Sequence, residues 1–391
     1  MNKVSIISLL FVTILICNSC KKKEDNIQLL KAQNFISTLD GKKVSLYTLK
    51  NRNGAIAQFT NYGARWLSMW VQDKNGIFAD VVLGFDSLIQ YRNAGEKYHG
   101  AIVGRTCGRI DEGLFTLNGT TYKLANNDGF GEPVRNNLHG GKKGYHDVVW
   151  ETNQSKNNKD EETIVFTYFS KDGEEGFPGN LLVKVVYTLT DDNAIKIEYL
   201  ATSDKPTPVN LTNHAFFNLS GDMSTDVLKQ NLTILADSFI ECNRFLIPTG
   251  KILPVKGTPL DFTKPTPVGQ HINDESDQVF KGKGFATAYV VCKDTSAFKK
   301  VAVLEDPVSG RTLEVFSNQQ GLQLYNAWLF NGTDVGKGNC KYFANTGLVL
   351  ETQNHPDAPN HSNFPSIILQ PGHRYYHKAI YKFGVKTIET K

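Results

Sequence analysis

The sequence is poor in methionine and cysteine and has no excess of charge of one sign. Of its 391 residues, 3 are methionine and 6 are cysteine, and 43 basic residues are balanced by 39 acidic ones, for a formal net charge of +4. No basic block lies in the expected folded part, so we expect no nucleic-acid partner. The cysteines beyond position 20 contain no CxxC pair, which argues against a zinc site and a dense disulfide framework but leaves one or two disulfides open. These cysteines are Cys107, Cys242, Cys292 and Cys340.

A long apolar run is also missing. The longest one near the N-terminus, from Val4 to Ile16, is too short for a confident membrane span. It follows one basic residue and precedes Ser19-Cys20, which fits a secretory signal and looks like the cleavage and lipidation site of a bacterial lipoprotein. We therefore expect a signal peptide over residues 1–20 with lipidation at Cys20, a tether over 21–34, and a periplasmic, lipid-anchored protein. A plain signal peptide and a retained anchor are the alternatives.

Helical periodicity is nearly absent. It is confined to residues 28–35 and a short turn near Ser87–Tyr91. Elsewhere, short alternating or apolar runs are separated by turn residues, as where Asn118-Gly119 divides two runs and predicts a hairpin. With 33 glycines and no internal linker, the chain from residue 35 to 391 is predicted to form one large all-β domain, a sandwich or a barrel.

The most informative segment surrounds His214. The histidine follows Asn210 and Asn213 and precedes Phe216 and Phe217, so polar groups that could hold a neutral imidazole lie beside flat apolar surface. Histidine titrates near neutrality and can give or take a proton at working pH. Phe216 or Phe217 could supply a face for the C–H surface of a sugar ring.

Other polar clusters interrupt the expected strands. An apolar run of the kind found in buried strands ends in Glu351. A buried carboxylate is either paired or takes part in a reaction, because burying an unpaired carboxylate is costly. The others contain Arg109 in a glycine-bracketed run, His139 in Asn136-Asn137-Leu138-His139-Gly140-Gly141, and Asp261 in Thr258-Pro259-Leu260-Asp261-Phe262.

Together and in this order, these segments resemble the aldose 1-epimerases, also called galactose mutarotases. The resemblance rests on Asn-Leu-Thr-Asn-His ending at His214, Asn-Asn-Leu-His-Gly-Gly around His139, and Leu-Glu-Thr-Gln around Glu351. Further matching stretches begin at Thr60-Asn61-Tyr62-Gly63-Ala64 and run to Tyr381-Lys382-Phe383, so the resemblance covers essentially all of the chain after about residue 35.

The resemblance implies a large antiparallel β-sandwich with an open groove, the supersandwich of the galactose mutarotases. It also implies a cofactor-free and metal-free exchange of the α and β anomers of hexoses such as D-galactose and D-glucose. Glu351 corresponds to the general base and His214 to the general acid. Arg109, His139, Asp261 and Gln319 correspond to sugar-binding positions, although Gln319 stands in Ser-Asn-Gln-Gln-Gly where the family usually has Gln-Pro-Gly.

Simpler roles exist for the binding residues. Arg109 could be a buried ion-pair partner, Asp261 could cap the turn after Thr258-Pro259, and His139 could brace a loop. For the whole protein, a glycoside hydrolase using two carboxylates and a non-catalytic sugar-binding lipoprotein are the alternative functions. A sugar-phosphate epimerase would need a basic cluster, and these segments contain none beyond Arg105 and Arg109.

Overall fold

The computed structural model describes residues 27–130, 134–280, 283–292 and 297–386, and the expected signal peptide with Cys20 lies outside these ranges. The prediction of an all-β chain is confirmed. In the described residues the one α-helix is α1 (Leu88–Asn93), and no helix is long and apolar enough to cross a membrane. Short 3-10 turns lie at Ala32–Phe35, Asp111–Gly113, Tyr145–Asp147, Glu174–Gly176, Val268–His271, Asp277–Val279, Lys337–Asn339 and Ala358–Asn360.

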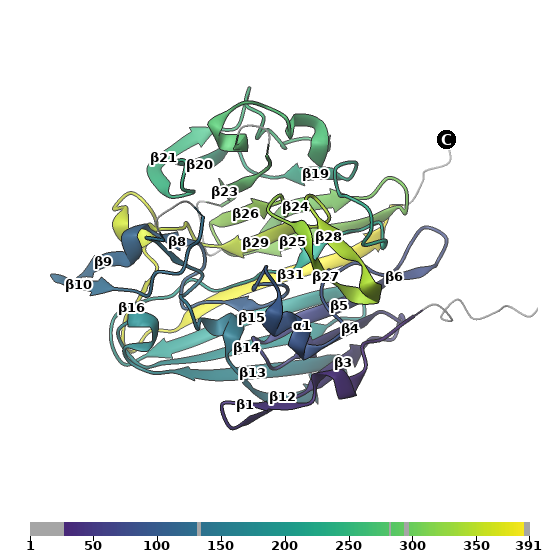
Figure 1. Ribbon diagram of the computed structural model, residues 1–391, viewed down its shortest axis with the longest axis horizontal. Coiled ribbons are helices and arrows are strands. Elements are labelled where there is room, and N and C mark those ends of the chain that lie inside the picture. Colours follow the sequence, from purple (N-terminus) through teal and green to yellow (C-terminus); the bar gives the residue numbers. More distant parts are fainter. Residues whose placement is uncertain (1–26, 131–133, 281–282, 293–296, 387–391) are drawn as a thin grey trace, which may run out of the picture.

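The largest element is a nine-stranded antiparallel sheet that runs through the middle of the molecule, where β15 and β31 pair (Figure 1). Alternating residues of its strands are buried, because one face of a sheet packs on the core and the other faces water. In order, its strands are β12 (Glu151–Lys156), β13 (Glu162–Ser170), β14 (Leu181–Leu189), β15 (Ala194–Ser203), β31 (Tyr375–Val385), β25 (Arg311–Ser317), β24 (Lys299–Glu305), β19 (Asn231–Ile234) and β22 (Thr266–Pro267).

Two further antiparallel sheets pack around it. The six-stranded sheet has the order β18 (Phe216–Phe217), β29 (Leu348–Gln353), β26 (Gly321–Tyr325), β23 (Ala286–Val290), β20 (Ser238–Cys242) and β21 (Pro248–Pro254). The four-stranded sheet consists of β3 (Leu46–Lys50), β4 (Ile56–Thr60), β5 (Arg65–Gln72) and β6 (Phe78–Asp80). β12 and β13 lie at one end of the molecule and β20 and β21 at the other (Figure 1).

Short antiparallel pairs connect these sheets. The predicted hairpin is confirmed: its two central residues, Asn118 and Gly119, both have positive φ, as a tight two-residue turn requires. The pairs are β9 (Leu114–Leu117) with β10 (Thr120–Lys123), β1 (Ser37–Leu39) with β2 (Lys42–Val44), β8 (Arg109–Ile110) with β11 (Asn137–Leu138), β7 (Ile102–Val103) with β17 (Thr212–Asn213), β16 (Thr207–Pro208) with β30 (Ile368–Leu369), and β27 (Asn331–Val335) with β28 (Lys341–Phe343).

Trp66 on β5 joins the three large sheets. Its fully buried ring lies 5.6 Å from Phe217 of the six-stranded sheet and 5.9 Å from Tyr381 of the nine-stranded sheet, in edge-on contacts. Such tilted ring pairs stabilise a core beyond the area that they bury. Three sheets that are far apart in the sequence therefore meet at one aromatic cluster.

The segment expected to be a tether packs on the domain over its described residues. The backbone of Leu30 exchanges hydrogen bonds with the side chain of Gln58, and Ile27 packs against the buried Trp70 cluster. Apolar residues before position 35 therefore find partners on the domain. Cys107, Cys242, Cys292 and Cys340, all within the described ranges, form no disulfide.

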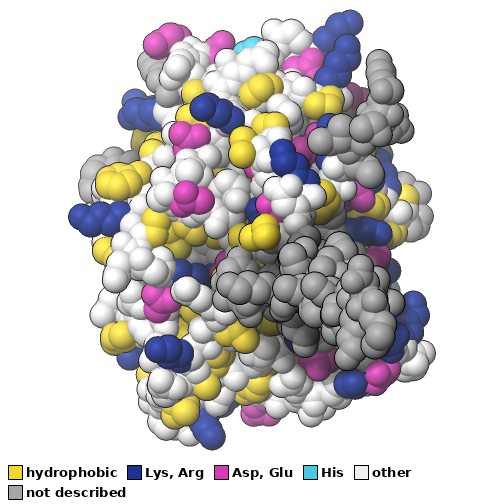
Figure 2. All heavy atoms as spheres, turned by 90° about the vertical axis from the view of Figure 1, so that its right-hand side faces the viewer, with side chains coloured by type: hydrophobic (Ala, Val, Ile, Leu, Met, Phe, Trp, Pro, Cys, Tyr) yellow, Lys and Arg dark blue, Asp and Glu magenta, His cyan; other side chains and the backbone are white. Residues whose placement is uncertain are grey.

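Charges of both signs are interspersed on the face shown in Figure 2, and no patch of one sign stands out there. This mixed surface agrees with the small net charge of the sequence.

We predict that Trp66→Ala lowers the free energy of unfolding by about 3–5 kcal/mol, because it removes the ring shared by the three sheets. Urea unfolding followed by circular dichroism measures this change. Val308→Ala is the matched control, since Val308 is 74% exposed and its truncation is expected to change stability by about 0.5 kcal/mol or less. Equal stability of the two variants would contradict the joining role of Trp66.

Candidate active site

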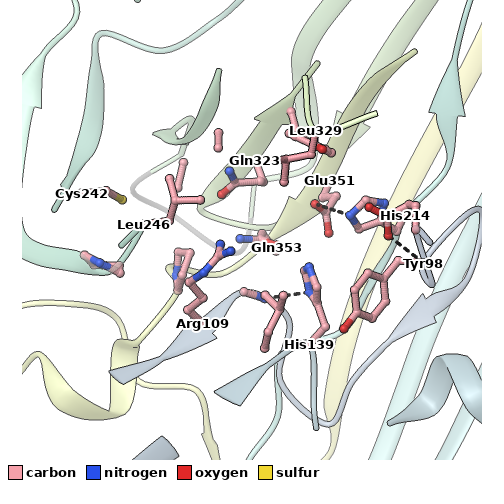
Figure 3. Close-up of a pocket in the computed structure, with 18 of the residues that line it drawn as sticks. Tyr98, Arg109, His139, His214, Cys242, Leu246, Gln323, Leu329, Glu351 and Gln353 are labelled. Carbon is pink, nitrogen blue, oxygen red and sulfur yellow. Dashed lines mark hydrogen bonds and ion pairs between the residues drawn. The ribbon is translucent and has the colours of Figure 1, made fainter. Parts of the chain in front are cut away.

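One face of the six-stranded sheet forms the floor of an open cavity. Side chains from strands and from the loops above them converge on it (Figure 3). The lining residues are Glu96, Tyr98, Gly108, Arg109, Leu138, His139, His214, Cys242, Leu246, Pro248, Ala286, Ala288, Gln323, Tyr325, Trp328, Leu329, Glu351, Gln353 and Pro356.

Glu351 stands on β29, in which every residue is buried. Its side chain is 2% exposed, and its Oε1 lies 3.6 Å from Nε2 of His214, while Oε2 has no hydrogen-bond partner among the described residues. Burial raises the pKa of Glu351 well above that of an ordinary glutamate, and the nearby Glu96 raises it further. The carboxyl thus favours its protonated form.

His214 lies between β17 and β18, at the edge of the same sheet. Its backbone N–H donates to the carbonyl of Ala101, and its own carbonyl accepts from the N–H of Gly100. The ring rests 5.0 Å from that of Phe216 and 5.4 Å from that of His139. Burial lowers the pKa of His214 to about 3, so the imidazole favours its neutral form.

The asparagines of this segment hold the backbone rather than the imidazole, which differs from the sequence-based expectation. Asn213 donates to the carbonyl of Gly100 and to the Tyr187 hydroxyl. Asn210 donates to the carbonyl of Asn354 and accepts from its N–H. This second pair ties the His214 segment to the residue just beyond the end of β29, so it fixes His214 relative to Glu351.

His139 follows β11 and lines the cavity. Its Nδ1 accepts a hydrogen bond of 3.2 Å from the N–H of Gly108, which leaves Nε2 to carry the proton. Gly140 must follow it, because a Cβ there would lie 1.8 Å from the carbonyl oxygen of Gly104. The loop therefore holds His139 in place and directs its Nε2–H donor at the cavity.

Arg109 on β8 both lines the cavity and forms an ion pair. Its Nε donates to Asp128 over 2.7 Å and its Nη2 over 3.2 Å, and the Asp128 side chain is only 1% exposed. The carboxylate fixes the guanidinium, which also lies over the ring of Phe130 at 5.7 Å. Arg105, in contrast, donates to the carbonyls of Pro178 and Gly179 and does not line the cavity.

Three of the residues expected to contact the sugar do not line the cavity. Asp261 accepts hydrogen bonds from the N–H and the hydroxyl of Thr263, so its carboxylate caps its own turn. Gln319 precedes the start of β26 at Gly321 and is buried in the turn. Phe216 is fully buried under His214 and positions that ring instead of offering a face to a sugar.

Two glutamines that the sequence reasoning missed take these places. Gln323 lies directly opposite Glu351 across the β26–β29 ladder, so both point to the same face. Gln353 follows Glu351 by two residues and shares its face. Gln353 is 1% exposed, and neither of its amide atoms has a partner among the described residues, which suits groups that await ligand hydroxyls.

Comparison with known proteins agrees with this geometry. The family model for aldose 1-epimerase matches residues 45–382. The chain belongs to the aldose 1-epimerase family. It is 41% identical over 325 residues to the galactose mutarotase of Bos taurus, a match that covers 83% of this chain and 90% of that protein. It is 34% identical to the aldose 1-epimerase of Escherichia coli, covering 88% and 96% of the two chains.

Solved structures of aldose 1-epimerase type share the fold. An aldose epimerase homologue from C. elegans superposes with a TM-score of 0.78 at 28% identity, covering 88% of this chain and 100% of that one. A galactose 1-epimerase from Lactobacillus acidophilus superposes with a TM-score of 0.77 at 26% identity, covering 90% and 97%. The predictions of an aldose 1-epimerase and of a galactose mutarotase-like sandwich are therefore confirmed.

We predict a bell-shaped pH dependence whose alkaline limb depends on Glu96. We expect the His214–Glu351 pair to work with one shared proton, so activity should be lost when that proton leaves at high pH or a second arrives at low pH. Burial raises the pKa of Glu96 to about 7, so Glu96 is negative only above that pH, where it retains the shared proton.

Glu96→Gln should therefore move the alkaline limb to lower pH by roughly one pH unit and leave the acid limb nearly unchanged. Initial rates of anomer exchange measured from pH 4 to 10 give both limbs. Glu112→Gln serves as the control, because Glu112 is 56% exposed and does not line the cavity. An alkaline limb that stays in place would disprove the influence of Glu96.

Proposed function

We propose that this cavity exchanges the α and β anomers of hexoses such as D-galactose and D-glucose by opening and closing the sugar ring. The observation that carries the proposal is the buried pair of Glu351 and His214, with Oε1 and Nε2 3.6 Å apart. One carboxylate and one imidazole form the smallest set that can remove a proton from one sugar oxygen while giving a proton to another.

Ring opening then proceeds by two coupled proton transfers. Glu351, as the carboxylate, takes the proton of the hydroxyl on C1, and the imidazolium of His214 gives its proton to the ring oxygen as the C1–O5 bond breaks. The open aldehyde rotates about the C1–C2 bond, and the reversed transfers close the ring on the other face of C1. The pair returns to its starting state, so the cycle consumes no reagent.

Burial determines how much free energy the proton transfer from Glu351 to His214 requires. Burial favours the neutral form of both groups, with the proton on Glu351 rather than on His214. Moving it across produces an ion pair in a site with little water, where the attraction between the two charges is strong. The sugar hydroxyls replace the missing solvent, so the charged pair forms where a substrate is present.

The remaining polar side chains of the cavity hold the sugar. Arg109 and the Nε2 of His139 donate to sugar oxygens, and the Gln323 and Gln353 amides can both donate and accept.

A glycoside hydrolase remains the second candidate, because one observation supports it. Hydrolysis needs two carboxyl groups around the scissile bond. Asp261 cannot serve, but Glu96 lines the same cavity as Glu351. Release of a monosaccharide from a glycoside by the wild-type protein, and its loss in the Glu96→Gln variant, would support a glycoside hydrolase.

A non-catalytic sugar-binding protein would bind a hexose without changing the rate at which its anomers equilibrate in water.

The location of the protein is part of the same proposal. A lipid on Cys20 would hold the domain at a bacterial membrane on the periplasmic side, where it would act on released or imported sugars. The support is the apolar run of the sequence before Ser19-Cys20.

Glu351→Gln and His214→Asn should each lower turnover by about a hundredfold or more, because each removes one proton-transfer group. Polarimetry of freshly dissolved α-D-galactose and α-D-glucose measures the rates, and thermal unfolding confirms that each variant is folded. Asp261→Asn is the matched control and should keep the wild-type rate, since its carboxylate only caps a turn. Near-wild-type turnover in either of the first two variants would disprove the mechanism.

Cys20→Ala should move the full-length protein from the membrane fraction to the soluble fraction and abolish incorporation of labelled palmitate. Cys17→Ala tests the neighbouring thiol and should change neither readout. Membrane retention of the Cys20 variant would contradict lipid anchoring.

A further inference from the structure

A buried histidine outside the cavity connects the two segments that carry the proton-transfer pair. His377 lies on β31 of the nine-stranded sheet, is fully buried, and does not line the cavity. Its Nδ1 lies 3.1 Å from the carbonyl oxygen of Leu211, and its Nε2 lies 3.0 Å from the hydroxyl oxygen of Thr352. Leu211 stands three residues before His214, and Thr352 directly follows Glu351. One imidazole therefore contacts both segments.

The partners of His377 determine its tautomer. A carbonyl oxygen can only accept, so Nδ1 carries the proton and donates to Leu211, and the Thr352 hydroxyl donates to the unprotonated Nε2. Burial lowers the pKa of His377 to about 3, so the ring stays neutral and keeps both bonds near neutral pH. His377 therefore supplies one donor and one acceptor that do not exchange roles.

The ring of His377 has little freedom to rotate. It is stacked on the ring of Tyr199, its direct neighbour on β15, with centroids 4.4 Å apart and an interplanar angle of 9°. A rotated ring would break both hydrogen bonds inside the core, where an unpartnered polar group is costly. The nine-stranded sheet therefore holds the imidazole in one orientation.

Each of these hydrogen bonds acts close to a reacting side chain. Leu211 and His214 flank the two-residue strand β17, so a shift of Leu211 is carried to the imidazole of His214. Glu351 points into the cavity, and Thr352 points away from it, because successive residues of a strand face opposite sides. His377 therefore holds β29 from behind, without occupying space that a sugar needs.

Two tyrosines on β31 support this arrangement. The Tyr375 hydroxyl accepts a hydrogen bond of 3.1 Å from the N–H of Leu211, and the Tyr381 hydroxyl donates over 2.8 Å to the carbonyl of Leu350, the residue before Glu351. Each tyrosine hydroxyl bonds to the backbone of one segment, whereas the imidazole of His377 bonds to both segments. His377 is thus the side chain through which β31 couples them.

We propose that His377 is a positioning residue that sets the distance between Glu351 and His214. Both proton transfers depend on where these two groups stand relative to the sugar, and a misplacement of about 1 Å can lower a rate about a hundredfold. This inference rests on the proposed mutarotase function and adds to it a residue that contacts neither the sugar nor the transferred proton.

His377→Phe tests the inference, because phenylalanine keeps a ring against Tyr199 and removes both hydrogen bonds. In polarimetry with α-D-galactose, this variant should lower kcat about tenfold and change KM less than about twofold, since the residues that hold the sugar stay in place. His377→Asn keeps a donor for Leu211 and should restore kcat to within about threefold of the wild-type value. His373→Phe, at an exposed histidine before the same strand, is the matched control and should keep the wild-type kcat.

Thr352→Val removes one of the two hydrogen bonds with a side chain of the same shape, and it decides the question if His377→Phe does not fold. It should lower kcat about threefold and leave KM unchanged. An unchanged kcat in Thr352→Val or in folded His377→Phe, or a KM that rises as far as kcat falls, would overturn the inference and leave the mutarotase function standing. No acceleration by folded wild-type protein would overturn the proposed function itself.

Discussion

The proposed chemistry of this protein depends on one proton that two buried side chains share. Glu351 and His214 are both almost fully buried, and burial shifts their pKa values in opposite directions, toward the neutral form of each. Neither group alone would suit an acid–base cycle near neutrality. As a pair 3.6 Å apart they hold the proton between them, and the surrounding cavity determines on which partner it resides.

The six-stranded sheet arranges this pair and the rest of the cavity in rows. Because directly opposed residues of adjacent strands share a face, the polar row from Glu351 to Gln323 continues into the apolar Ala288 without a change of geometry. Arg109 on β8 and His139 after β11 reach the same cavity from outside this sheet.

Much of this could be predicted from the sequence. Turn residues between short alternating runs indicated the all-β fold, and motif order indicated Glu351, His214, Arg109 and His139. The remaining residue positions depend on how the chain folds in three dimensions. The Asp261 carboxylate accepts hydrogen bonds from Thr263 in its own turn, and no sequence motif indicates this. Gln323 enters the cavity because of strand register, which a single sequence does not specify when several glutamines stand close together.

The asparagine pair between the His214 segment and the end of β29 has a consequence for how activity arises. Asn210 and Asn354 are separated by 144 residues. Their hydrogen bonds connect the segment that carries His214 with the strand that carries Glu351. Contacts of such long range form late, because a large loop must close first. During refolding, catalytic activity should therefore appear later than secondary structure. Activity then reports the formation of the complete native structure rather than the initial collapse of the chain.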